Sequence, residues 1–398
     1  MPSEPSRLPQ ADWTRRDDLA HLVATLGADN TRYVGGAVRD TLLGKTISDI
    51  DCATPLHPAE VIDRCREAGI RTVPTGIDHG TVTAVLEGGP VEITTLRRDI
   101  STDGRRATVA FATEWKEDAS RRDFTINALY AHPETLEISD YFGGVEDLAN
   151  GRVRFIGEAA QRIREDHLRI LRYFRFQSRF GAEWDAEATA ACAELASTLK
   201  GLSRERVGGE LRALLALPDP APTVAKMRDL GVLQVVLPEA GRREIRKLTE
   251  LCEVEARYDI APDAIRRLSA LLPALPNVAE AVSARLRLSR MQRDRLTCAA
   301  ARDPSDVDDP FALAYYEGIE CARDRLLLTA TDPSPLDGWK TPQLPLKGGE
   351  IVERGVAKGP QVARTLQAIE RRWVAEGFPD RSRVEELLDE ELARGHPA

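Results

Sequence analysis

The 398-residue sequence lacks any long apolar run. No stretch approaches the ~20 apolar residues that a membrane-spanning helix requires. Residues 1–30 contain neither an apolar signal core nor a small-residue cleavage pattern. These absences predict a protein without a membrane anchor and favour a cytoplasmic location.

The sequence also lacks a C-x-x-C motif, although it contains six cysteines. Scattered cysteines of this kind indicate neither a zinc site nor a disulfide framework. We therefore expect each of them to be a small buried side chain. The six are Cys52, Cys65, Cys192, Cys252, Cys298 and Cys321.

Positive charge is also in short supply, since the formal net charge is -9. An acidic balance counts against a polyanionic partner, because affinity for phosphates comes from clustered Lys and Arg. One segment departs from this balance: residues 152–179 hold eight arginines and three acids. Such a run is either a solvated helix face or a binding surface, and composition alone does not decide between them.

The pattern of apolar residues predicts an α+β protein of two to three domains. Strand-like runs occupy residues 71–75, 80–96 and 136–142, with a hairpin turn at Gly88-Gly89 and a helix over 58–69. After about residue 155 the strand signals vanish and helical periodicity replaces them. Proline-rich breaks at residues 217–223 and 303–310 are plausible joints between helical parts.

A first chemical motif is "YVGGAVRD", residues 33–40. A strand that runs into Gly35-Gly36 and then into a helix gathers backbone N–H groups, which suits a phosphate chain. Arg39, one turn into that helix, adds a group able to bind phosphate in a bidentate way. Alone, such a turn is weak evidence for a phosphate site.

A second motif follows at Asp49 and Asp51, in alternate positions of an expected strand. Their carboxylates project from one face, and they repel each other unless a cation lies between them. Oxygen ligands beside a phosphate site favour Mg²⁺, and such a pair can hold two ions for phosphoryl chemistry.

The ordered motifs resemble those of the class II tRNA nucleotidyltransferases, the family of CCA-adding enzymes and bacterial poly(A) polymerases. After "GGAVRD" and "DID" they are "RRDFTINALY" (121–130), "DYFGGVEDLANGRVRFIG" (140–157), "EDHLRILRYFRF" (165–176) and "SRERVGGEL" (203–211). The resemblance implies a polymerase-β-like head with a mixed sheet, followed by an all-helical neck, body and tail. The domains expected from it are a helical lead-in (1–30), the head (31–153), the neck (154–217) and the body with tail (218–398).

The resemblance also implies roles for single residues. The metal ligands are Asp49 and Asp51, which make up the catalytic pair, with Glu92 as a weaker third candidate. Asp123 and Asn127 are expected to contact the ribose or to stabilise the local structure. An alternative for Asp123 is the N-terminal cap of a helix. The triphosphate is bound by Gly35, Gly36, Arg39, Arg122 and, with it, Arg121.

The arginine ladder "EDHLRILRYFR", residues 165–175, is expected to be one helix with a buried apolar side. Its free side offers Asp166, which accepts hydrogen bonds, and Arg169, which donates them. Adenine and cytosine present an amino donor beside a ring acceptor and fit this pair, whereas guanine and uracil do not. Arg172 and Arg175 are expected to support the base-reading pair or to contact phosphates.

The function implied is template-independent addition of C, C and A to the 3′ end of tRNA. CTP and ATP are the substrates, tRNA is the partner, and two Mg²⁺ ions are the cofactors. A poly(A) polymerase or an enzyme that adds only A is an alternative, as is a catalytically silent RNA-binding protein. Residues 95–124 are either a mobile loop that switches the pocket from C to A or an ordinary hairpin. The sequence leaves the oligomeric state open.

Overall fold

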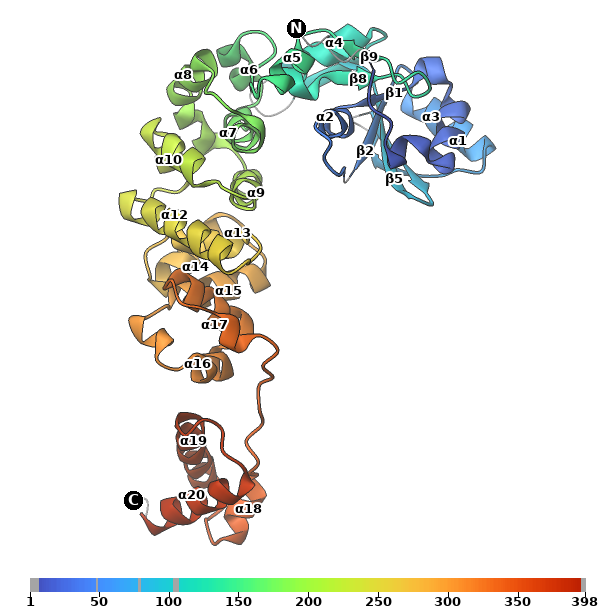
Figure 1. Cartoon of the computed structure of the whole chain (residues 1–398). Helices are drawn as coiled ribbons and strands as arrows, with labels where there is room; N and C mark the ends of the chain where they lie inside the picture. Colours follow the sequence, from blue (N-terminus) through green and yellow to red (C-terminus); the bar gives the residue numbers. More distant parts are fainter. Residues whose placement is uncertain (1–6, 48, 78–79, 103–106, 395–398) are drawn as a thin grey trace. The chain divides into compact units, whose positions relative to one another are not determined.

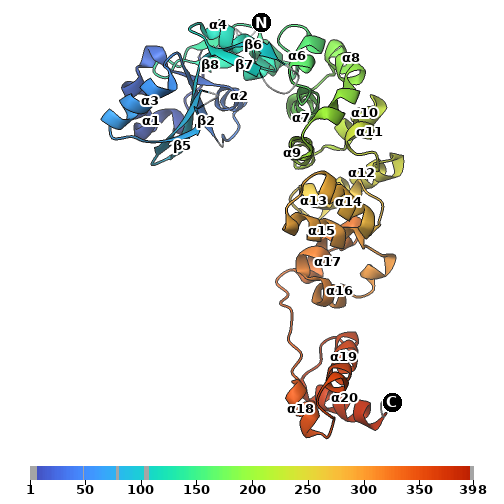
Figure 2. The same ribbon diagram turned by 180° about the vertical axis from the view of Figure 1, so that it is seen from behind.

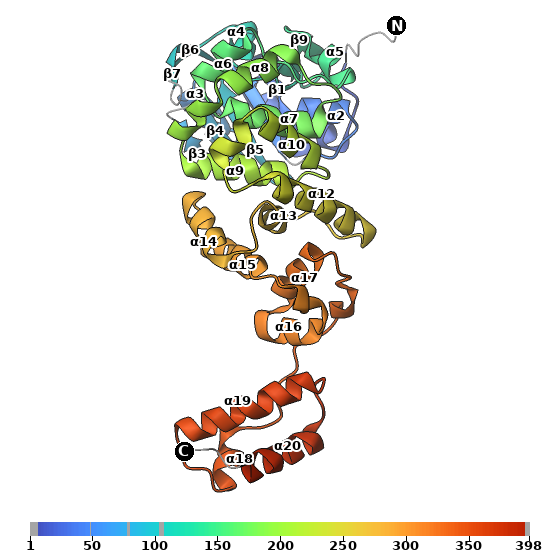
Figure 3. The same cartoon turned by 90° about the vertical axis from the view of Figure 1, so that its left-hand side faces the viewer.

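The computed structural model describes residues 7–47, 49–77, 80–102 and 107–394. The chain forms two compact units, Met1–Pro238 and Glu239–Ala398. Figure 1 labels their elements, and Figures 2 and 3 show the same elements from two further sides. The α+β fold class expected from the sequence is confirmed, with the strands of the described residues all in the first unit.

A mixed sheet of seven strands forms the centre of the first unit, in the order β3-β4-β5-β2-β1-β8-β9. β2 and β5 are parallel, and the other neighbouring strands are antiparallel. Along β5 the buried side chains alternate with more exposed ones, as one covered face requires. The strands are β1 (Arg32–Val34), β2 (Ile50–Thr54), β3 (Arg71–Gly76), β4 (Thr81–Leu86), β5 (Gly89–Thr95), β8 (Leu129–Ala131) and β9 (Ile138–Asp140).

Short helices connect these strands. The expected helix over 58–69 is α3, which begins at Pro58, a residue suited to the first helical turn, and buries Val61 and Cys65. The expected hairpin at Gly88-Gly89 joins β4 to β5, with Leu86 paired to Gly89. The helices of this part are η1 (Asp12–Arg15), α1 (Asp17–Leu26), η2 (Ala28–Asn30), α2 (Gly36–Leu42), α3 (Pro58–Glu67), α4 (Trp115–Ser120), η4 (Thr125–Asn127) and α5 (Gly144–Ala149).

A two-stranded hairpin occupies part of residues 95–124, and the switching role of this segment stays a prediction. β6 (Arg97–Thr102) and β7 (Ala107–Phe111) pair as a two-stranded antiparallel sheet. Residues 103–106, between the two strands, lie outside the described residues. The start of β6 is fixed by the backbone N–H of Arg97, which donates to Asp118 Oδ1 at 3.1 Å.

The arginine ladder is not one helix, so that prediction is wrong. α6 ends at Glu165, Asp166 has extended backbone angles, and α7 begins at Arg169. The Asp166 carboxylate accepts the N–H of Leu168 at 3.1 Å, a local turn that competes with helical hydrogen bonding. The expected apolar side is nevertheless buried, at Ile163, Ile170, Leu171 and Phe174.

Helices complete the first unit and make up the second. The remaining helices of the first are α6 (Ala159–Glu165), α7 (Arg169–Phe180), α8 (Ala186–Glu194), η5 (Ala196–Gly201), α9 (Arg204–Leu215), α10 (Ala221–Asp229) and α11 (Val232–Val236). Those of the second are α12 (Arg242–Arg257), α13 (Ala264–Ala270), α14 (Pro276–Arg285), α15 (Arg290–Ala300), η6 (Pro304–Val307), α16 (Pro310–Glu317), α17 (Ile319–Leu328), η7 (Ser334–Leu336), α18 (Gly348–Glu353), α19 (Pro360–Ala375) and α20 (Arg381–Ala393). None of the helices among the described residues has the length and apolar character needed to cross a bilayer.

Two of the six cysteines correct the sequence analysis. Cys298 on α15 and Cys321 on α17 form a disulfide, with their Cα atoms 6.1 Å apart. They are 23 residues apart in sequence, and only the packing of α15 against α17 brings them together. The expectation of small buried side chains is confirmed for Cys52, Cys65 and Cys192, whereas Cys252 is half-buried.

Candidate active site

A cavity of 460 Å³ in the first unit brings together most of the residues expected to form the site. Its wall carries six arginines and four acids, an excess of positive charge in an acidic chain. Asp49 and Arg175 are the two expected site residues that do not line it. Those that do are Gly35, Gly36, Arg39, Asp51, Glu92, Arg121, Arg122, Asp123, Asn127, Asp166, Arg169 and Arg172.

The acidic part of the wall comes from the parallel strands β2 and β5. Asp51 and Glu92 are paired in register, so their side chains leave the sheet on the same face. Asp49 stands one residue before β2 and is exposed. Burial raises the pKa of Asp51 to about 6, with further contributions from the nearby carboxylates of Glu92 and Asp49. Asp51 and Glu92, on adjacent strands, offer oxygen donors alone, and such donors suit a hard cation such as Mg²⁺.

The Gly35-Gly36 turn leads from β1 into α2, as the motif predicts. Gly35 has φ of 69°, a conformation that L side chains rarely adopt. A Cβ on Gly35 would lie 3.6 Å from Nη1 of Arg122, so the turn passes close to a cavity arginine. The Gly35 N–H donates to the carbonyl of Leu129, the first residue of β8, at 3.2 Å. This N–H is therefore already used in a hydrogen bond to a strand.

Arg39 is buried and held from two sides. Its Nε donates to Asp40 Oδ1 at 2.9 Å, and its Nη1 donates to Asn127 Oδ1. The guanidinium also lies 4.5 Å from the ring centroid of Phe180, within cation–π distance. Burial lowers the pKa of Arg39, and Asp40 partly offsets this effect. A group with so high an ordinary pKa stays charged, so Arg39 is a fixed cation at the cavity wall.

Arg121 and Arg122 share one buried carboxylate, that of Asp118. Arg121 Nε donates to Asp118 Oδ1 at 2.9 Å, and Arg122 Nη2 donates to Oδ2 at 3.2 Å. The Tyr130 hydroxyl donates to the same Oδ2 at 2.6 Å. Burial by itself raises the pKa of Asp118, but Arg122 and Arg121 outweigh it and bring the value to about 2. Asp118 was missed by the sequence analysis, because nothing in "KEDAS" marks it as buried.

Asp123 connects the segment between α4 and η4 to α7. Its Oδ2 accepts from Arg172 Nε at 2.7 Å, and its Oδ1 accepts from Asn127 Nδ2 at 3.0 Å. Oδ1 also accepts the backbone N–H of Phe124, the residue that precedes η4, so Asp123 is not the side-chain cap of that turn. Burial raises the pKa of Asp123, and Arg172 more than reverses this, leaving the pKa below its ordinary value.

The base-reading candidates lie where α6 meets α7. Asp166 Oδ2 accepts from Arg206 Nη2 of α9 at 2.8 Å. Arg169 does not pair with Asp166 directly: its Nη1 donates to Glu165 Oε2 at 2.7 Å and its Nη2 to the carbonyl of Arg121 at 3.0 Å. Asp166 and Arg169 therefore line one cavity as separately anchored groups.

The last two arginines of the ladder, Arg172 and Arg175, form ion pairs with Glu210 of α9. Arg175 Nε donates to Glu210 Oε2 at 2.7 Å, and Arg172 Nη1 lies 3.7 Å from Glu210 Oε1. Arg175 also lies over Phe176, with 4.6 Å between guanidinium carbon and ring centroid. Glu210, like Arg206, belongs to the motif "SRERVGGEL", whose residue pattern carries the family resemblance but predicts no role for either side chain.

Acids on two central strands of a mixed sheet, arginines and a glycine turn line one cavity, which is the set of groups that nucleotidyl transfer uses. Residues 31–154 match the family described as "Poly A polymerase head domain". Residues 184–242 match the one described as "Probable RNA and SrmB- binding site of polymerase A".

Curated relatives then specify the family. The human "CCA tRNA nucleotidyltransferase 1, mitochondrial" is 34% identical over 87% of this chain and 83% of its own length. The "CCA-adding enzyme" of Leuconostoc mesenteroides is 43% identical over 85% of this chain and 86% of its own length. The crystal structure of the Bacillus stearothermophilus CCA-adding enzyme in complex with CTP aligns with 95% of this chain and 98% of that one, at a TM-score of 0.72 and 27% identity. The chain belongs to the family of CCA-adding tRNA nucleotidyltransferases.

Proposed function

We propose that the protein adds C, C and A in turn to the 3′ end of tRNA, consuming CTP and ATP and releasing pyrophosphate. One observation carries the proposal: the acidic pair Asp51 and Glu92, the arginines and the base-reading candidates Asp166 and Arg169 line a single cavity. The relatives' names support it, because they describe CCA addition in human and bacterial proteins.

Two Mg²⁺ ions are the proposed cofactors, held by Asp49 and Asp51 with Glu92 as the third carboxylate. Bound there, such ions lower the pKa of the attacking 3′-hydroxyl and stabilise the leaving pyrophosphate. The raised pKa of Asp51 is consistent with this assignment: burial is its main cause, the carboxylates of Glu92 and Asp49 add to it, and a bound cation would favour the ionised form.

The triphosphate is proposed to lie against Gly36, Arg39, Arg121 and Arg122. Arg39 is fixed by Asn127, and Arg121 and Arg122 by Asp118, so these cations meet the phosphates without losing further side-chain freedom. Gly35 contributes through its turn, because its own N–H is occupied by the sheet.

Asp166 and Arg169 are proposed to read the base edge. A carboxylate has about four acceptor positions, and Asp166 uses two of them on Leu168 and Arg206. It therefore retains capacity for the amino group of cytosine or adenine. A guanine or uracil carbonyl in that place faces an acceptor, which leaves both groups unpaired at a cost of roughly 1–3 kcal/mol each.

The remaining expected residues are proposed to hold this arrangement in place. Arg172 ties Asp123 to α7, and Asn127 joins Asp123 to Arg39, so one chain of hydrogen bonds links the phosphate and base ends of the cavity. Arg175 lies outside the cavity wall and supports α7 through Glu210.

The experiment that tests the proposal supplies purified protein and Mg²⁺ with tRNA that ends before CCA, before CA and before A. Each nucleoside triphosphate is given singly and together. CCA addition requires CTP on the first two ends and ATP on the third. Incorporation of A on every end would support the poly(A) alternative, which the name of the matched head family keeps open. No incorporation at all would favour the silent RNA-binding protein.

The cytoplasm remains the proposed location. The vertebrate relatives are named as mitochondrial proteins, so fractionation of cells that express the tagged chain is the direct test.

A further inference from the structure

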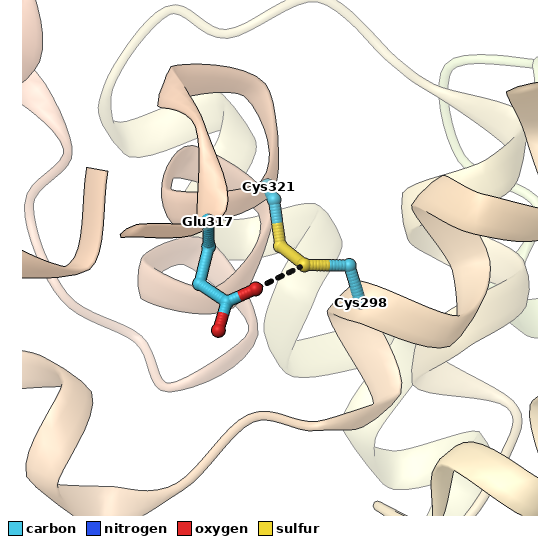
Figure 4. Close-up of side chains that lie close together, drawn as sticks. All are labelled: Cys298, Glu317 and Cys321. Atoms are coloured by element: carbon cyan, nitrogen blue, oxygen red, sulfur yellow. Dashed lines mark hydrogen bonds between the residues drawn. A yellow bond between two sulfur atoms is a disulfide. The ribbon is translucent and has the colours of Figure 1, made fainter. Parts of the chain in front are cut away.

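The disulfide between Cys298 and Cys321 lies in the second unit, apart from the residues assigned to nucleotidyl transfer. Figure 4 shows the Glu317 carboxylate directed at the Cys298 sulfur, and the two atoms are 3.4 Å apart. Since a disulfide sulfur carries no hydrogen, this contact becomes a hydrogen bond only when Cys298 is a thiol. Glu317 therefore offers an acceptor to the Cys298 thiol that reduction of the disulfide would produce.

The pair is accessible to a small reagent. Both sulfur-bearing residues line a cavity of 660 Å³, whose wall also includes Met291, a side chain that is 75% exposed. Cys298 is half-buried, whereas Cys321 is 6% exposed. Solvent can thus reach the Cys298 sulfur, whereas the Cys321 sulfur is more deeply buried. This is the arrangement expected of an attacking and a resolving cysteine.

The helices that the disulfide joins are also held by other contacts. Arg295 of α15 donates to both carboxylate oxygens of Asp324 on α17, at 2.6 and 3.0 Å. Leu296 and Leu326, one from each helix, are fully buried. Because these contacts do not involve sulfur, we expect α15 and α17 to stay packed when the disulfide is reduced. The packing of the two helices therefore does not depend on the disulfide.

The disulfide closes a segment that carries α16. From α16, Tyr315 donates to Glu370 of α19 at 2.6 Å, and its ring lies 5.7 Å from that of Trp373. Closing a loop of this length removes conformational freedom from the unfolded chain. Oxidation therefore stabilises the part of the second unit on which the C-terminal helices are seated.

We propose that Cys298 and Cys321 are a reversible thiol–disulfide modification site, oxidised by low-molecular-weight disulfides and reduced by low-molecular-weight thiols. The Cys298 thiolate attacks one sulfur of the small disulfide, forms a mixed disulfide and releases one small thiolate. The Cys321 thiolate then attacks Cys298 Sγ and releases the second. The two cysteines lose two electrons and two protons, and the small disulfide becomes two thiols. In a reducing compartment such bonds are transient and regulatory rather than structural.

The test compares the full-length protein equilibrated in oxidised and in reduced glutathione, then denatured and labelled with maleimide. We expect two fewer labels after oxidation, a cross-linked peptide containing Cys298 and Cys321, and full recovery of labelling in reduced glutathione. The oxidised protein should melt about 5 °C higher than the reduced one.

Three variants make the assignment specific. Cys321→Ser should stop at a mixed disulfide between glutathione and Cys298, and Cys298→Ser should form neither product. Both should lose the difference in melting temperature. Cys252→Ser, which replaces a half-buried cysteine of the same unit, should keep it.

Three results would overturn the proposal. The first is equal labelling under both conditions, and the second is a mixed disulfide that persists in the unsubstituted protein. The third is one tightly bound Zn²⁺ per reduced chain, lost in both serine variants, because Cys298, Cys321 and Glu317 would then be metal ligands.

Discussion

Each unit contains a cluster of arginines and carboxylates, and the two clusters differ in what surrounds them. The cavity cluster of the first unit consists of Asp118, Arg121, Arg122, Asp123 and Arg172. The body cluster of the second unit consists of Glu255, Arg266, Arg267 and Asp324.

In the body cluster the charges satisfy one another away from solvent. Glu255 accepts from Arg266 Nε at 2.7 Å and from Arg267 Nε at 2.8 Å, and all three residues are buried. In the cavity cluster the acids are equally buried, but the arginine side chains of Arg122 and Arg172 remain 20% and 33% exposed. The comparison teaches that paired arginines indicate a ligand site when their free side opens onto a cavity, and a structural role when it does not.

Among the substitutions that test this comparison, the largest expected effect is a loss of turnover from a change in the cavity. Asp51→Asn keeps the side-chain shape and removes a negative charge that the proposed mechanism requires, so activity should fall about 10⁴-fold or more. Stability should stay or rise, because the substitution also removes repulsion from Glu92. Nucleotide incorporation and thermal unfolding without Mg²⁺ measure the two effects.

The control is Asp63→Asn, a change to an exposed acid of α3, which should alter neither quantity. Normal turnover in Asp51→Asn would contradict the assignment of the metal site.

The body cluster should respond in the opposite way. Glu255→Gln leaves two buried guanidinium groups without their shared negative charge, which costs about 3–5 kcal/mol of unfolding free energy. Turnover per folded molecule should not change. Urea unfolding followed by incorporation assays at low temperature separates these outcomes, with the exposed Glu250 as the matched control in Glu250→Gln. A stable but inactive Glu255→Gln protein would contradict the division between the clusters.

Base selection should be affected next. Asp166→Ala removes the acceptor proposed to read the amino group, so discrimination against UTP and GTP should fall by about 1–3 kcal/mol, which is roughly 5- to 150-fold in relative kcat/KM. Arg206→Ala should have a smaller effect in the same direction, since Arg206 only anchors Asp166. The control is Glu194→Ala at an exposed position of α8. Unchanged nucleotide preference in Asp166→Ala would refute the base-reading role.

Much of the fold and of the cavity could be predicted because the signals are local. The hairpin turn at Gly88-Gly89 and the helix that begins at Pro58 follow from residues a few positions apart, and so does the Gly35-Gly36 turn. Asp51 was recognisable from its spacing to Asp49. The proposed domain boundaries at residues 30, 153 and 217 remain predictions.

What the sequence did not reveal depends on side-chain contacts that no spacing motif marks. Asp118 acquires its role from Arg122 and Tyr130, and Arg206 from an aspartate 40 residues earlier. The break at Asp166 was missed because helical periodicity continues on both sides of a single local hydrogen bond. Cys298 and Cys321 share no spacing motif, and only the packing of two helices brings them together.

Asp118 combines features of both clusters. It is as buried as Glu255, although the arginines that it pairs with line the cavity. Its pKa is about 2 in the folded protein, below the ordinary value of 3.8. A carboxyl of this kind adds stability that is complete above about pH 4 and is lost as pH falls through 2. The contribution is about 2 kcal/mol. Urea unfolding of the first unit's signal between pH 5 and pH 2 should therefore show a smaller loss in Asp118→Asn than in the unsubstituted protein, whereas Asp63→Asn should match the latter. If the unfolding free energy fell equally with pH in Asp118→Asn, Asp63→Asn and the unsubstituted protein, Arg121 and Arg122 would not hold this carboxyl ionised. The cavity arginines would then be anchored in another way.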